Sequence, residues 1–187
     1  MDRAPAPLPH MLGGIQPVGA VEEDRIREGM ASQEKGSVIK FTVYGQPGPM
    51  GSKRFVGLSK SGKGLMVESS KAVKPWREAV KWAAIQSGAR GLDGPLWVSM
   101  VFTIKKPKSA PKRKRTWPCT KPDLSKLARS TEDAISDSGV WADDARVVEY
   151  LRLAKVYPGE DRDALDRPGC LITIMTEAEA WPMAVAA

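Results

Sequence analysis

The stretch DLSKLARSTEDAISDSGVWADDARVV, residues 123–148, decides the fold of this chain. Its apolar residues recur at three- and four-residue spacing up to Ile135, a pattern typical of an amphipathic helix. Asp123 stands where such a helix takes its N-cap, and Gly139 stands just beyond its end. The spacing therefore predicts a helix over 124–137, a reversal at Gly139 and a strand over 146–156.

The expected helix has two unlike sides. At 100° per residue its core side carries Leu124, Leu127, Ala128, Thr131, Ala134 and Ile135. The other side carries Ser125, Arg129, Glu132 and Ser136, with Asp133 beside them. The reversal at Gly139 can bring Asp143 or Asp144 close to Asp123. Two carboxylates so placed could hold one Mg²⁺, which prefers oxygen ligands, although an Asp N-cap and a paired Asp in a turn are also ordinary structural features.

Outside this stretch the patterns predict further strands and one more helix. β-branched and aromatic residues favour strands at 38–44, 96–104 and 171–175, and a hairpin tip at 60–64. A stripe of Trp76, Val80, Ala83 and Ala84 predicts a helix over 71–87, capped by Ser69 or Ser70. The order β, α, β, α, β, β predicts an α+β domain, a small mixed β-sheet with two main helices packed on one face. We expect tryptophans 76, 82, 97 and 141 in its core.

The ends of the chain read differently from its middle. Residues 1–36 are rich in Pro, Gly and charge and predict a disordered N-terminal extension. The expected domain covers 37–177, and the Ala-rich residues 178–187 predict a flexible tail.

The charge is uneven and favours a polyanionic partner. The 187-residue chain has a net charge of +7, and residues 105–115 carry seven Lys or Arg and no acid. The only histidine, His10, lies in the N-terminal segment, which argues against a Ser-His-Asp or Cys-His mechanism in the domain. Cys119 and Cys170 lack metal or disulfide spacing. Because no apolar run reaches membrane-spanning length and no phosphate-binding loop is present, we expect a cytoplasmic protein with no membrane partner and no nucleotide cofactor.

The stretch quoted above resembles the RusA family of Holliday junction resolvases, which are phage- and prophage-type endodeoxyribonucleases. The matching residues are Asp123, Leu127, Arg129, Asp133-Ala134-Ile135, Gly139, Trp141, Asp143-Asp144 and Val147-Val148. The turn Gly45-Gln46-Pro47-Gly48-Pro49 and the segment Lys53-Arg54-Phe55 look similar too, so the resemblance covers about 38–177.

The resemblance implies a Mg²⁺-dependent homodimer, with Mn²⁺ able to substitute, that binds four-way or other branched DNA and nicks two strands symmetrically in DNA recombination and repair. The metal-linked positions of the family fall on Asp123, Ser125 and Asp144, with Asp143 beside the last. The family's catalytic lysine falls on Arg129. The expected DNA-binding residues are Lys53, Arg54, Lys105, Lys106, Lys108, Lys112, Arg113, Lys114, Arg115 and Lys121.

Ser125 departs from the family pattern, because the family has an acid there. A neutral hydroxyl is a weak metal ligand, and we expect Glu132 to replace the lost carboxylate, with Asp133 nearby. The alternative function is a branched-DNA-binding protein with weak or no nuclease activity. A third possibility is a phage interaction protein whose basic loop, residues 105–121, binds RNA or an acidic partner. That loop could also be a solvated linker, while Phe55 or Trp117 could wedge into an opened junction.

Overall fold

A computed structural model describes residues 38–51, 53–59, 61–68, 70–111 and 113–180, which all belong to one compact unit. Four strands form one sheet in the order β1-β6-β4-β5. Their bounds are β1 Ile39–Tyr44, β4 Leu96–Thr103, β5 Val147–Val156 and β6 Gly169–Thr176. β6 pairs antiparallel with β1 and β4, whereas β4 and β5 are parallel. The sheet is therefore mixed, as expected.

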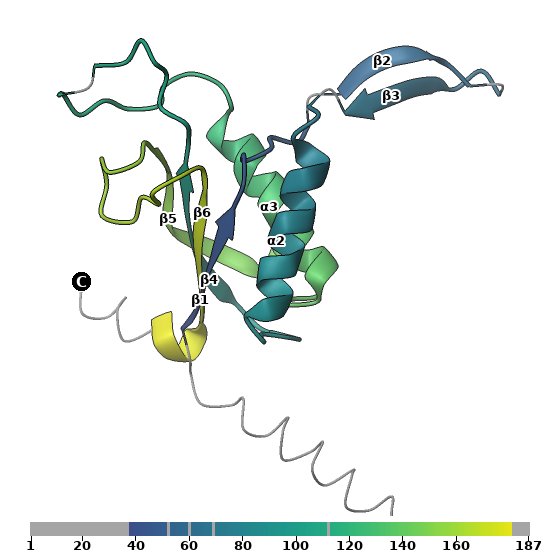
Figure 1. Ribbon diagram of the computed structural model, residues 1–187. Coiled ribbons are helices and arrows are strands. Elements are labelled where there is room, and N and C mark those ends of the chain that lie inside the picture. The colour runs from purple at the N-terminus through teal and green to yellow at the C-terminus, as the bar shows by residue number, and fades with distance from the viewer. Residues whose placement is uncertain (1–37, 52, 60, 69, 112, 181–187) are drawn as a thin grey trace, which may run out of the picture. The chain divides into compact units, whose positions relative to one another are not determined.

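Two helices cover one face of this sheet (Figure 1). They are α2, Val73–Gln86, and α3, Leu124–Ser138, which ends at Gly139 in the left-handed conformation. Trp76 of α2 is 1% exposed, packs near Phe102 of β4 and donates its indole N–H to the Thr131 hydroxyl at 3.1 Å. This hydrogen bond lies in the core and fixes the two helices against each other. One mixed sheet with two main helices on one face confirms the predicted α+β fold.

The segment between β1 and α2 forms a hairpin of its own. β2, Lys53–Leu58, pairs antiparallel with β3, Gly64–Glu68, in a separate two-stranded sheet. The predicted tip is confirmed, because the Ser59 N–H donates to the Lys63 carbonyl at 2.7 Å.

The turn after β1 is pressed onto the starts of both helices. A Cβ on Gly48 would lie 2.4 Å from the Ala72 carbonyl oxygen, so only glycine fits there. The Met50 N–H donates to the Lys126 carbonyl at 3.0 Å. The turn is thereby fixed beside the first turn of α3, where Asp123 stands.

Several details differ from the expectations. α2 begins after Ala72 with no side-chain cap, so Ser70 is not the N-cap, and Ser69 lies outside the described residues. Trp82 is 63% exposed and Trp97 is partly exposed, because α2 turns the Trp76 stripe inward and Trp82 away from it. Residues 177–180 form a helical turn in which Ala180 is 4% exposed, so ordered structure continues past 177. The expected extension at 1–36 lies outside the described residues, as does the tail beyond 180.

Candidate active site

Asp123 occupies the N-cap position of α3 without using its side chain as a cap. Its backbone is extended, and its carbonyl accepts the Leu127 N–H at 3.2 Å. The carboxylate makes no capping hydrogen bond; it lies 3.3 Å from the Lys126 ammonium and its side chain is 49% exposed. An N-cap Asp commonly bonds the backbone of the first turn. Here the carboxylate is left open to solvent and to a ligand.

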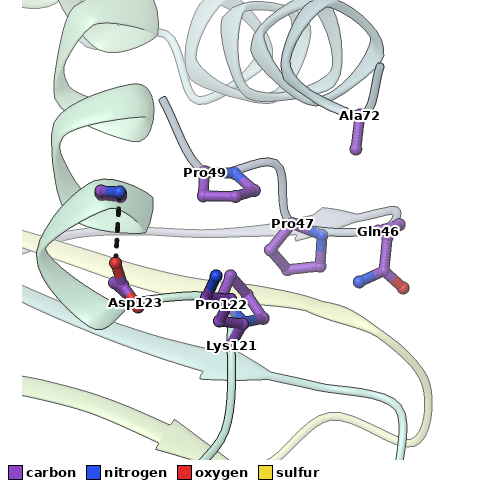
Figure 2. Close-up of a pocket in the computed structure, with 8 residues that line it drawn as sticks. Gln46, Pro47, Pro49, Ala72, Lys121, Pro122 and Asp123 are labelled. Carbon is purple, nitrogen blue, oxygen red and sulfur yellow. Dashed lines mark ion pairs between the residues drawn. The ribbon is translucent and has the colours of Figure 1, made fainter. Parts of the chain in front are cut away.

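A pocket of about 310 Å³ opens beside this carboxylate. Figure 2 shows proline rings of the turn after β1 on one side and the Asp123–Lys126 ion pair on the other. The lining residues are Gln46, Pro47, Pro49, Ala72, Lys121, Pro122, Asp123 and Lys126. The family-like turn and the first candidate acid therefore belong to one concave site.

Lys155, on β5, holds the chain just before Asp123. Its ammonium donates to the Thr120 carbonyl at 2.8 Å and to the Pro122 carbonyl at 2.7 Å. Hydrogen bonds from a charged donor are stronger than neutral ones. Lys155 therefore sets the direction in which the chain enters α3 and presents Asp123.

Glu132 lies deeper, between α3 and β5. It is 9% exposed, and the Tyr150 hydroxyl donates to its Oε1 in a short hydrogen bond. Burial raises the pKa of Glu132, the Tyr150 bond opposes this, and the charges of Asp144 and Asp133 raise it further. The pKa of Tyr150 is raised by burial and by the same Glu132. The wheel put Glu132 on the open side of α3; this was wrong because β5 covers that position.

Asp144 and its neighbours form a second acidic region. The negative charge of Asp144 raises the pKa of Glu132 and of Asp133. For Asp133 the largest cause is burial, and Arg77 of α2, whose guanidinium lies 3.5 Å from it, opposes the shift. Arg77 also contacts Asp137 at 2.5 Å. Asp133 is therefore already paired with a cation. Glu132 has only the Tyr150 hydroxyl as a partner, and the charge of Asp144 acts against its ionisation.

Asp143 and Asp144 differ in what they do locally. Asp143 caps the short 3-10 helix η1, Asp144–Arg146, because its Oδ1 accepts the Ala145 N–H at 2.8 Å. Asp144 has no such bond and is exposed. Of the two, Asp144 has the carboxylate that is not engaged with the backbone.

The structure brings only some of the predicted ligands together. Ser125 and Arg129 are exposed on α3, one turn apart. Glu132 lies nine positions after Asp123, which corresponds to a rise of about 13 Å along the helix. Among the described hydrogen bonds and ion pairs none joins Asp123 to Asp143 or Asp144, and the described residues hold no group of three or more His, Cys, Asp or Glu placed to share an ion. The pairing of Asp123 with Asp144 stays a prediction.

The donor types nevertheless suit a hard cation. Asp123, Asp144 and Glu132 supply carboxylate oxygens, which Mg²⁺ prefers, and Glu132 is a buried acid facing another acid. A bound cation would relieve that repulsion.

The basic loop reaches solvent with most of its charges. Lys105, Lys108, Arg113, Lys114, Arg115 and Lys121 are exposed, and Lys112 lies outside the described residues. Lys106 pairs with Glu160, and Arg115 lies over the exposed Trp117, 4.3 Å from the ring centroid. Lys53 and Arg54 begin β2.

The model of the family Endodeoxyribonuclease RusA matches residues 45–164. This chain belongs to the RusA endodeoxyribonuclease family. The matched range runs from the turn that lines the Asp123 pocket, through α3 and Asp144, to the loop after β5. The resemblance stated from the sequence is thus confirmed.

A bacterial relative is similar to about two thirds of this chain. The chain is 31% identical over 134 residues to the uncharacterized protein YqaN of Bacillus subtilis strain 168, which covers 66% of this chain and 91% of the relative. Among the described residues of this RusA-family chain, no helix is both long and apolar enough to cross a membrane.

Three residues around the RusA-type site escaped the sequence reasoning. Arg77 pairs with Asp133, and Tyr150 donates a hydrogen bond to Glu132. Lys155 holds the chain just before Asp123. Each is an ordinary polar residue in its own helix or strand. Nothing local marks it, since its partner lies far along the chain.

Proposed function

We propose that this RusA-family chain is a Mg²⁺-dependent, structure-selective endodeoxyribonuclease that resolves four-way DNA junctions by paired symmetric nicks, acting as a homodimer. The observation that carries the proposal is the family match across Asp123, α3 and Asp144, together with the state of those two acids. Both carboxylates are exposed and neither caps its own backbone. Acids left open in this way, with a basic loop leading directly into Asp123, suit phosphodiester chemistry better than a structural role.

Asp123 and Asp144 are the acids that would hold the Mg²⁺, with Asp143 and the Ser125 hydroxyl as further oxygen donors and Mn²⁺ as a substitute ion. When bound, the ion would polarise the scissile phosphate and lower the pKa of an attacking water. Arg129 is exposed on the Ser125 side of α3, and its guanidinium would stabilise charge that develops on the phosphate. Glu132 would add the missing negative charge from beside Asp144.

The basic loop supports DNA as the substrate. Its exposed lysines and arginines would bind phosphates of a junction arm without reading bases. Contacts of this kind would position the DNA backbone, while the carboxylates would act on one phosphate.

A second function is favoured by one specific observation. Ser125 stands where the family has an acid, and the described residues hold no three-acid group. A branched-DNA-binding protein with weak or no nuclease activity would look the same, since the basic loop alone supplies the affinity.

One experiment separates the two functions. A labelled four-way junction is incubated with the wild type, with Asp144→Asn and with Ser125→Asp, each with Mg²⁺ and with EDTA. We expect Asp144→Asn to bind the junction and to lose cleavage by about 100-fold or more, and Ser125→Asp to cut at least as fast as the wild type, because it restores a charged ligand. Junction binding by all three proteins, with no cutting by any, would support the binding protein instead.

A further inference from the structure

Glu160 joins two points of the basic loop that lie ten residues apart. It lies in the connection between β5 and β6, and its Oε1 accepts a short hydrogen bond from the Lys106 ammonium. Its Oε2 accepts the Thr116 N–H at 3.1 Å and the Thr116 hydroxyl at 3.5 Å. The side chain is only 15% exposed. One carboxylate thus joins residue 106 to residue 116.

The neighbouring residues extend this contact into the loop and down to the sheet. The Lys106 ammonium also donates to the Pro111 carbonyl at 2.7 Å, halfway along the loop. Asp161, 7% exposed, lies 2.6 Å from Arg152 of β5 and 3.7 Å from Arg115. The basic loop is therefore fastened to β5 at Arg115 as well as held together by Glu160.

This arrangement is unexpected in a surface that binds phosphate. Seven cations between 105 and 115 repel one another, and an acid placed among them lowers the attraction for DNA. The Lys106 hydrogen bond holds the pKa of Glu160 below its usual range, so the acid keeps its charge. An acid held charged at this place needs a role that outweighs its repulsion of phosphate.

We infer that Glu160 is a positioning residue for DNA recognition: by joining Lys106 to Thr116 it holds the basic loop so that Lys108, Arg113 and Lys114 are presented to the phosphates of branched DNA. The inference rests on the proposed function for its substrate. Closing the loop in advance removes conformational entropy that binding would otherwise cost.

The direction in which one substitution changes the affinity for DNA shows whether Glu160 positions the loop or acts only through its charge. Glu160→Gln keeps the size of the side chain but removes the charge that holds Lys106. If Glu160 acts only through its charge, its loss strengthens binding to DNA. If Glu160 positions the loop, binding to the junction weakens although the protein has become more positive.

Asp166 offers a matched control. It lies in the same β5–β6 connection, is exposed, and makes no hydrogen bond or ion pair within the described part of the chain. Asp166→Asn changes the net charge by the same amount as Glu160→Gln. The two variants and the wild type are compared in Kd for a four-way junction without divalent ions, in KM and kcat with Mg²⁺, and in the rate of tryptic cleavage within 105–116.

For Glu160→Gln we expect a junction Kd and KM raised by about fivefold, the effect of losing one charge-assisted contact, with kcat unchanged. Tryptic cleavage of the loop should be faster, and Asp166→Asn should bind as tightly as the wild type or slightly more tightly. Tighter junction binding by both variants would overturn the inference. Failure of the wild type to bind any junction would overturn the proposed function and the DNA role of Glu160 together, whereas unchanged tryptic cleavage would overturn the loop closure alone.

Discussion

The Glu132 carboxylate is held almost out of water between α3 and β5, with a tyrosine hydroxyl as its partner and Asp144 as its charged neighbour. A buried acid without a cation destabilises the folded chain when it is ionised. Asp133, one residue on, has Arg77. Keeping an unpaired acid at 132 is therefore a stability cost that a functional site would explain.

The pH dependence of stability tests this cost. Burial raises the pKa of Glu132 above the ordinary 4.5, so the penalty is absent below that value and grows as pH rises through the raised pKa. Glu132→Gln retains an oxygen for Tyr150 and removes the charge. In EDTA at pH 7 we expect its Tm to exceed that of the wild type by roughly 2–5 °C, with the difference vanishing near pH 4. Exposed Glu177→Gln should change neither value, and an equal Tm for Glu132→Gln and wild type at pH 7 would contradict the account.

At this scale the sequence was a partial guide. The N-cap position of Asp123 and the end of α3 at Gly139 follow from local spacing and are confirmed. A helical wheel describes one helix by itself, so it could not foresee that β5 would cover Glu132. Trp82 was placed in the core for its size, although its angle from Trp76 already put it on the outer side of α2.

At the scale of elements, the turn after β1 connects the fold to the candidate site. It packs on the start of α2 through Gly48 and on the first turn of α3 through the Met50 N–H, and its prolines line the pocket at Asp123. Strands and helices were predictable here because each buries a periodic stripe. The close approach of turn and helix was not, since a Pro-Gly turn alone does not show what it packs against.

Gly48→Ala tests that close approach. Its Cβ would lie 2.4–2.8 Å from backbone atoms of Ala72 and Val73. The variant can relieve this clash only if the helix or the turn moves. We expect a loss of about 1–3 kcal/mol in the free energy of unfolding, measured in urea. Gly64→Ala is the control, because its Cβ meets only the Phe55 ring at 3.3 Å, a side chain that can shift. Equal losses in the two variants would show that the turn is not packed this closely.

At the scale of the whole molecule, the basic loop carries seven cations and no acid between 105 and 115, whereas α3 and η1 mix four acids with three cations. The family pattern in 123–148 predicted the fold class and the family together. The shape of the basic loop could not be predicted, because it is held by Glu160 and Asp161, which come after β5 and about 45 residues further along the sequence than the loop. Contacts between distant segments depend on the completed sheet.

Salt dependence of DNA binding tests the role of this charge distribution. Lys114 is exposed on the basic loop, and Lys81 is exposed on α2. Lys114→Ala should reduce the steepness of the fall of log K for DNA binding with log salt concentration by about 1, because one phosphate contact is lost. Lys81→Ala should leave this slope unchanged. Equal slopes for the two variants would place the DNA elsewhere.

The most direct test of the central claim is to map the products that the wild-type chain makes from a four-way junction labelled on each strand in turn. With Mg²⁺ we predict nicks at symmetric positions in two opposite strands, and with EDTA no nicks on any strand. A junction that stays fully bound and uncut in Mg²⁺, and uncut in Mn²⁺ as well, would contradict the claim that this RusA-family chain is a resolving nuclease.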